Sequence, residues 1–146
     1  MKTIPATPKY QAWLTPEIMH RDSKKWLSEL RFIKDEELFF CDLVKSYTIQ
    51  LIQSKHFSYS KELVAKLKLV QTETLQLIDT IVCHEKGLKI MVDETNQVKE
   101  ENNYRIEHGK LIITVTTFLH EYRTLKSQLF TFIKTIIKEG KQKRLA

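Results

Sequence analysis

The sequence predicts an all-α fold: an elongated up-down-up antiparallel three-helix bundle with coiled-coil-like packing. Only three glycines and three prolines occur among 146 residues, so helix breakers are few. Apolar residues recur at alternating steps of four and three along three long segments, which is the heptad spacing of helices that pack side by side. Short polar stretches separate the segments, and short connections favour antiparallel neighbours.

The ends of the chain differ in composition from this region. Residues 1–14 contain two prolines and no apolar periodicity, which predicts an extended N-terminal arm. Residues 15–140 are assigned to the bundle, as one domain large enough to bury its own core, and residues 141–146 to a basic tail. No apolar run is long enough for a membrane span or a secretory signal, so a cytoplasmic protein that makes no membrane contact is expected.

The first helix is predicted over residues 16–55. Thr15, Pro16 and Glu17 form a favourable start, because a hydroxyl can cap the helix, proline suits the first turn and an acid faces the positive end of the dipole. The next polar break is "KHFSYSKE" at 55–62. The apolar stripe, or seam, of this helix comprises Trp26, Leu30, Ile33, Glu37, Phe40, Val44, Tyr47 and Leu51.

The second helix is predicted over residues 60–93. Gly87 could end it early, but the heptad spacing continues through Leu88 and Met91. We therefore predict a continuous helix, at a cost of about 1 kcal/mol relative to alanine. The second turn is expected near residues 94–97. The seam comprises Leu63, Leu67, Val70, Thr74, Leu77, Ile81, His84, Leu88, Met91 and Thr95.

The third helix is predicted over residues 98–139, with Gly140 as its terminator. Its seam follows the same alternating steps of four and three. The members are Tyr104, His108, Leu111, Val115, Phe118, Tyr122, Leu125, Leu129, Phe132 and Ile136.

Four polar residues interrupt the seams: Glu37, Thr74, His84 and His108. Facing positions of an antiparallel hairpin have residue numbers of constant sum, which places His84 opposite His108. Glu37 lies about one heptad away, where Thr74 or a lysine could be its partner. Buried polar groups of this kind fix the register of the helices, because a slipped register would leave them unpaired. A register-setting polar core layer is the favoured interpretation.

A metal site is the alternative interpretation of the histidines. His84 and His108 could bind a transition metal, with Glu85, Glu107 or Glu29 completing the coordination, since imidazole and carboxylate suit zinc, iron or manganese. No cofactor is otherwise expected. The sequence has no Gly-rich phosphate loop or nucleophile elbow, and its two cysteines lack metal-binding spacing. Without a metal, burial should lower the pKa of both imidazoles.

The first helix carries more apolar residues than one seam requires. Phe32, Phe39 and Leu43 form a second line beside the seam. Such a surplus indicates a contact surface, so the predicted function is non-enzymatic protein–protein association. Homodimerisation along the first helix is its simplest form, and a different, unknown protein partner is the other.

The net charge of +6 is carried by the ends of the chain. Lysines and one arginine gather where the first turn and the C-terminus should meet, near the rings of His56, Phe57 and Tyr59. This basic tip comprises Lys55, Lys61, Lys134, Lys138, Lys141, Lys143 and Arg144. Weak nucleic-acid binding at this tip is a third interpretation. The near-neutral helices favour a solubilising tail over nucleic acid as a partner.

Overall fold

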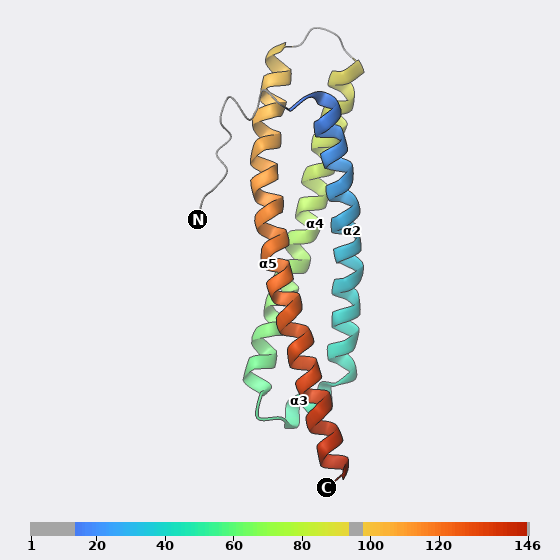
Figure 1. Cartoon of the computed structure of the whole chain (residues 1–146), viewed down its shortest axis with the longest axis vertical. Coiled ribbons are helices and arrows are strands. Elements are labelled where there is room, and N and C mark those ends of the chain that lie inside the picture. Colours follow the sequence, from blue (N-terminus) through green and yellow to red (C-terminus); the bar gives the residue numbers. More distant parts are fainter. Residues whose placement is uncertain (1–13, 94–97, 146) are drawn as a thin grey trace. The chain divides into compact units, whose positions relative to one another are not determined.

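The computed structural model describes residues 14–93 and 98–145, and the side chains of residues 14–90 and 101–141. The described residues form helices α2 (Pro16–Ser46), α3 (Thr48–Gln53), α4 (Phe57–Asp93) and α5 (Val98–Leu145), without a strand, so the all-α prediction is confirmed (Figure 1). None of the described helices contains a stretch long and apolar enough to cross a membrane. The predicted turn at 94–97 and the predicted arm, except Leu14, lie outside the described residues.

The first predicted helix is divided in two, and the prediction of one uninterrupted helix over 16–55 was wrong. It starts as expected, with the Ile18 N–H donating to Thr15 Oγ1 at 3.2 Å. It breaks at Tyr47, whose N–H donates to the Val44 carbonyl three residues back. Beside the break, Ser46 Oγ and Thr48 Oγ1 donate to carbonyls of the preceding turn, at 3.0 Å (Asp42) and 2.8 Å (Lys45). These hydroxyls offer the carbonyls partners other than backbone N–H groups, which bends or ends helices.

Helix α4 runs without interruption through Gly87, as predicted. A side chain at this position would overlap the hydroxyl end of Tyr104 on α5, whose ring lies 5.6 Å from the ring of His84. Glycine is therefore required here by the close approach of a rigid aromatic side chain. The helix continues through Gly87 because the next residue, Leu88, is fully buried and its packing holds the chain in place.

Gly87→Ala is expected to destabilise the protein by about 1 kcal/mol, because overpacking at Tyr104 outweighs the better helix propensity of alanine. In a Tyr104→Ala background the same change should instead stabilise by about 1 kcal/mol. Gly140→Ala is the matched control, since nothing lies within 4 Å of a Cβ there, and it should be stabilising in both backgrounds. Urea unfolding measures all the variants. An unchanged sign for Gly87→Ala in the two backgrounds would contradict the role given to Tyr104.

Helix α5 continues past Gly140 to Leu145, so the predicted terminator and the helix end at 139 were wrong. Glycine ends a helix when it adopts a left-handed conformation, and Gly140 does not adopt one. The residues that follow are mostly lysine, glutamine and arginine, which have high helix propensity and favour the negative end of the helix dipole. The side chains of residues 142–146 lie outside the described part.

The helices form two compact units, each built from segments of α2, α4 and α5. Unit 1 comprises Met1–Phe32 and Leu75–Leu119, and its apolar cluster joins Leu14, Met19 and Leu88. Unit 2 comprises Ile33–Thr74 and His120–Ala146 and also contains α3. Its larger core consists of Phe40, Leu51, Leu63, Leu67, Leu125, Leu129, Phe132 and Ile136, all of them predicted seam residues.

Candidate functional site

The two seam histidines meet inside unit 1 and form the centre of a chain of four polar side chains. His84 Nε2 lies 3.0 Å from His108 Nδ1. The outer nitrogens contact carboxylates: His108 Nε2 lies 3.0 Å from Asp22 Oδ2 on α2, and His84 Nδ1 lies 3.2 Å from Glu107 Oε1 on α5. Side-chain contacts thus link α2, α5 and α4 in the order Asp22, His108, His84, Glu107.

Both imidazoles are enclosed by packing. Their side chains are 0% exposed, whereas those of Asp22 and Glu107 are 33% and 53% exposed. The Trp26 ring stacks on His108 with centroids 4.7 Å apart and an interplanar angle of 23°. The two imidazoles are themselves nearly parallel, at 28°. The layer is therefore dry in its middle and open to water at its two carboxylate ends.

The chain of contacts has one hydrogen bond more than two neutral imidazoles can supply. Each neutral ring carries a single N–H, and an ionised carboxylate only accepts. With two N–H groups for three contacts, one of the three contacts lacks its proton. The contact between His84 and Glu107 is the longest of the three, and Glu107 is the more exposed carboxylate. This favours an arrangement in which both rings donate through Nε2, His84 to His108 and His108 to Asp22.

Burial governs the ionisation of the pair. Desolvation lowers the pKa of His84 below its ordinary 6.5, against the opposing effect of Glu107. Desolvation also lowers the pKa of His108, against a smaller opposing effect of its hydrogen bond with Asp22. The lowered values agree with the expectation from sequence. A third proton would complete the chain of hydrogen bonds, but only in acid.

The geometry gives little support to the metal interpretation. The inner nitrogens face each other at hydrogen-bond distance, and a metal between them would need about 2 Å on each side. Of the proposed additional ligands, Glu107 contacts His84 Nδ1, while Glu85 contacts His20 Nδ1 instead. Among the side chains that the structure describes, no group of three or more His, Cys, Asp or Glu is arranged to hold a metal.

Sequence reasoning missed two members of this region. Asp22 lies one helical turn before Trp26, but the next step of the first seam leads to Ser23, so the seam pattern did not indicate Asp22. His20 pairs with Glu85 across α2 and α4, and Glu85 Oε2 is buried without a hydrogen-bond partner among the described residues. His20 was not expected to contact another helix, and no pattern in the sequence indicated that it would.

The other two members of the polar layer lie in unit 2. Glu37 is 1% exposed and Thr74 is fully buried. Thr74 Oγ1 lies 2.8 Å from Glu37 Oε2 and 2.8 Å from the Val70 carbonyl oxygen. A hydroxyl has one proton and cannot donate to both. If Glu37 is protonated it donates to Thr74, which donates to Val70, and every contact is satisfied.

The electrostatics of Glu37 agree with this arrangement. Burial raises its pKa to about 7, with the Thr74 hydrogen bond opposing and the charge of Glu36 contributing. Glu36 itself is tied to α5, accepting from Tyr122 Oη at 3.1 Å and from Lys126 Nζ at 2.7 Å. Burial and the neighbouring Glu36 also raise the pKa of Tyr122, so its hydroxyl stays a donor.

Two of the three residues predicted for the dimer surface are exposed. Phe32, in unit 1, is 62% exposed and Phe39, in unit 2, is 55% exposed, whereas Leu43 is half-buried. The buried Phe40 ring contacts Phe39 at 5.9 Å and Phe130 of α5 at 5.1 Å, both edge-on. Phe130 is 44% exposed and was not predicted. We call Phe39, Leu43 and Phe130 the aromatic surface of unit 2.

The structure describes the side chains of five of the seven residues of the predicted basic tip. Lys55, Lys61, Lys134, Lys138 and Lys141 are exposed, and the side chains of Lys143 and Arg144 lie outside the described residues. Lys61 places its ammonium group 4.9 Å from the centre of the Phe57 ring. This cation–π contact occupies one of the predicted base-stacking rings with the protein's own lysine.

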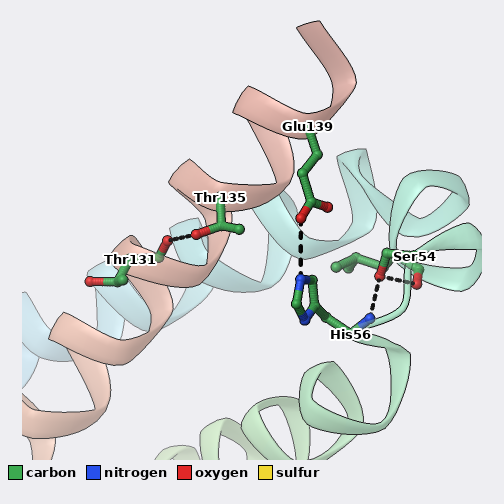
Figure 2. A network of polar contacts seen from close by, with 6 residues as sticks. Ser54, His56, Thr131, Thr135 and Glu139 are labelled. Carbon is green, nitrogen blue, oxygen red and sulfur yellow. Dashed lines mark hydrogen bonds and ion pairs between the residues drawn. The ribbon is translucent and has the colours of Figure 1, made fainter. Parts of the chain in front are cut away.

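A cavity of about 380 Å³ opens beside the tip, within unit 2. His56, Tyr59 and Phe132 supply its rings, and α5 supplies its polar groups from Ser127, Gln128, Thr131 and Thr135. Figure 2 shows Thr131, Thr135 and Glu139 on successive turns of α5, with the His56 ring directed toward Glu139. A second cavity, of about 310 Å³, is lined mainly by apolar residues of α2, α3 and α4, Phe57 among them.

Comparison with known proteins gives no further constraint. The chain matches no protein-family model, no curated protein and no solved structure.

Proposed function

We propose that this protein is non-enzymatic and acts through self-association, with the aromatic surface of unit 2 as the contact between two copies. The observation that carries the proposal is the exposure of the Phe39 and Phe130 rings, 55% and 44%, on either side of the buried Phe40. Exposed aromatic rings are concentrated in protein contacts, where they supply much of the binding energy.

Packing holds these rings at the surface. Phe40 is 1% exposed and fills the interior position, so neither neighbour can turn inward to replace it. Beside the rings, Glu36 and Lys126 form an ion pair that fixes α2 against α5. A rigid apolar patch bordered by charges of both signs is suited to a two-fold contact, in which each copy presents the same surface to the other.

The charge of α2 also permits pairing with itself. The helix contains seven acidic and six basic residues, and the carboxyl of Glu37 has a raised pKa, so two copies meet with little net repulsion. In this proposal the helices form the up-down-up, coiled-coil-like three-helix bundle that the heptads predict, in the cytoplasm. The free thiols of Cys41 and Cys83 suit such a reducing compartment.

Phe39→Gln is expected to weaken the dimer about 30-fold, because truncating a central aromatic contact costs about 2 kcal/mol. Phe130→Gln should act in the same direction. Leu69→Gln is the matched control, since Leu69 is 64% exposed on α4 of the same unit and should leave the dimer unchanged. Sedimentation over a range of concentrations measures the dissociation constant. A wild-type protein that stays monomeric at high micromolar concentration, or equal effects of the three variants, would refute the proposal.

A transition metal at the histidine pair is the second candidate function. The observation in its favour is that Nε2 of His84 and Nδ1 of His108 face each other with carboxylates at both outer ends. A bound metal would take the place of the shared proton and move the rings apart by about 1 Å. Elemental analysis of protein purified without an affinity tag tests this directly. Near-stoichiometric metal that is lost in His84→Leu would support the candidate, and metal-free protein would reject it.

A further inference from the structure

The cavity beside the start of α4 is lined by three aromatic rings, those of His56, Tyr59 and Phe132. Phe132 is 8% exposed and belongs to the core of unit 2. The Tyr59 ring stands at 78° to the Phe132 ring, with centroids 5.3 Å apart, and the His56 ring stands at 86°, with centroids 6.2 Å apart. The rings of Tyr59 and His56 are thus both nearly perpendicular to the Phe132 ring.

The position of His56 is fixed before any ligand arrives. Its backbone N–H donates to Ser54 Oγ at 3.1 Å, and Ser54 Oγ donates to the Leu51 carbonyl at 2.9 Å. Its ring nitrogen Nε2 lies 3.2 Å from Glu139 Oε1 (Figure 2). Because backbone and side-chain contacts already hold the His56 ring, it loses little conformational freedom when a ligand binds, which favours affinity.

Hydrogen-bonding groups also line the cavity. Ser127, Gln128, Thr131 and Thr135 line it from consecutive turns of α5. Thr135 donates its proton to the Thr131 carbonyl at 3.0 Å, which directs the remaining lone pairs of its hydroxyl oxygen as acceptors. The half-buried amide of Gln128 offers a donor and an acceptor side by side, the pattern that pairs with the N6 and N7 edge of adenine.

We propose that this cavity binds a nucleobase, adenine in particular, with the base stacked on Tyr59, one edge toward Phe132 and its polar edge against Gln128. Three observations support this ligand over an aliphatic one: an aromatic ring is present for stacking on a flat ligand, an amide and hydroxyls line the same cavity, and about 380 Å³ is within the range of small-molecule sites. The site shares no residue with the aromatic surface and does not depend on self-association.

The test is a titration of the full-length ¹⁵N-labelled protein with adenosine, followed by NMR. Adenosine should shift the side-chain amide of Gln128 and the backbone amides of Thr131 and Thr135, whereas ribose and inorganic phosphate should not. Tyr59→Leu should weaken binding about 5- to 150-fold, the range expected for loss of one stacking contact. Phe57→Leu is the matched control, because Phe57 is an exposed ring of the same helix turn that lines the other cavity, and it should change affinity less than twofold.

Two further measurements complete the test. The first asks whether Gln128 recognises the amino group of adenine, and the second asks whether the base comes from nucleic acid or from a free nucleoside. Gln128→Leu should weaken adenosine binding more than the binding of purine riboside, which keeps N7 but lacks the exocyclic amino group. Single-stranded oligoadenylate that shifts the same residues with higher affinity would identify nucleic acid as the source of the base, and equal affinity would identify a free nucleoside. The absence of shifts at millimolar adenosine, equal shifts with ribose, or equal effects of Tyr59→Leu and Phe57→Leu would overturn the proposal.

Discussion

Glu37→Gln is expected to stabilise the protein by about 3 kcal/mol above pH 8 and to leave its stability nearly unchanged at pH 4.5. Burial raises the pKa of Glu37 from an ordinary 4.5 to about 7, and each unit of difference corresponds to about 1.4 kcal/mol. Glutamine has nearly the same shape, carries no charge and can still contact Thr74 Oγ1. It therefore removes the cost of ionising a buried carboxyl.

The pH window of this effect follows from proton binding. Below pH 4.5 both the folded and the unfolded states hold the Glu37 proton, so Glu37 adds no pH dependence. Between pH 4.5 and 7 the folded state retains a proton that the unfolded state has lost, so the contribution of Glu37 to stability falls as pH rises. Above pH 7 the loss is complete and constant.

Urea unfolding at pH 4.5, 6 and 8.5 measures this difference. Glu62→Gln is the matched control, because Glu62 is an exposed carboxylate on α4 of the same unit and its replacement should matter little at any of these pH values. If Glu37→Gln were neutral or destabilising at pH 8.5, the folded protein would have to stabilise Glu37 as an ionised carboxylate. The single proton of Thr74 would then be donated to Glu37 and not to Val70.

Single replacement of either seam histidine by leucine should cost about 2–3 kcal/mol, whereas the double replacement should cost much less than the sum. His84→Leu leaves His108 Nδ1 buried without a partner. His108→Leu leaves the His84 Nε2–H unpaired and also removes the contacts with Asp22 and Trp26. An unpaired buried polar group costs about 1–3 kcal/mol, and exchanging both partners for apolar groups removes that penalty.

The double-mutant cycle is measured by urea unfolding at pH 7.5, with His120→Leu as an exposed control. The double replacement should also remove the acid sensitivity that the two histidines give the protein. Both histidines have a lowered pKa, so their contribution is complete above pH 6.5 and is lost as pH falls through their folded-state pKa values. Strictly additive effects would show that the two rings do not act as one layer.

These two polar layers give the units opposite responses to pH. Acid weakens unit 1, because the unfolded state takes up protons that the buried imidazoles resist. Raising the pH from 4.5 to 7 weakens unit 2, because a buried carboxyl must ionise. Both effects come from desolvation, and their signs differ because the charged form of histidine is protonated and that of glutamate is not.

The heptad pattern was sufficient to predict the helical class, most of the buried positions and the pairing of His84 with His108. These features depend on the period of the α-helix and on short connections, and both can be read along one chain. The Thr15 start of α2 depends on neighbouring residues alone and was equally accessible. The same seam positions left Thr74 and a lysine as possible partners of Glu37, and Thr74 is the one that contacts it.

The contacts between side chains at the edges of the helices could be seen in the tertiary structure alone. No pattern along the chain indicated that Tyr104 would lie over Gly87, that Asp22 rather than another carboxylate would pair with His108, or that Phe130 would extend the Phe39 surface. Such contacts depend on the rotamers and rotation of each helix, which several weak interactions set together. A periodic pattern specifies which face is buried, but it leaves open which atoms touch at the border of that face, where the proposed surface and cavity lie.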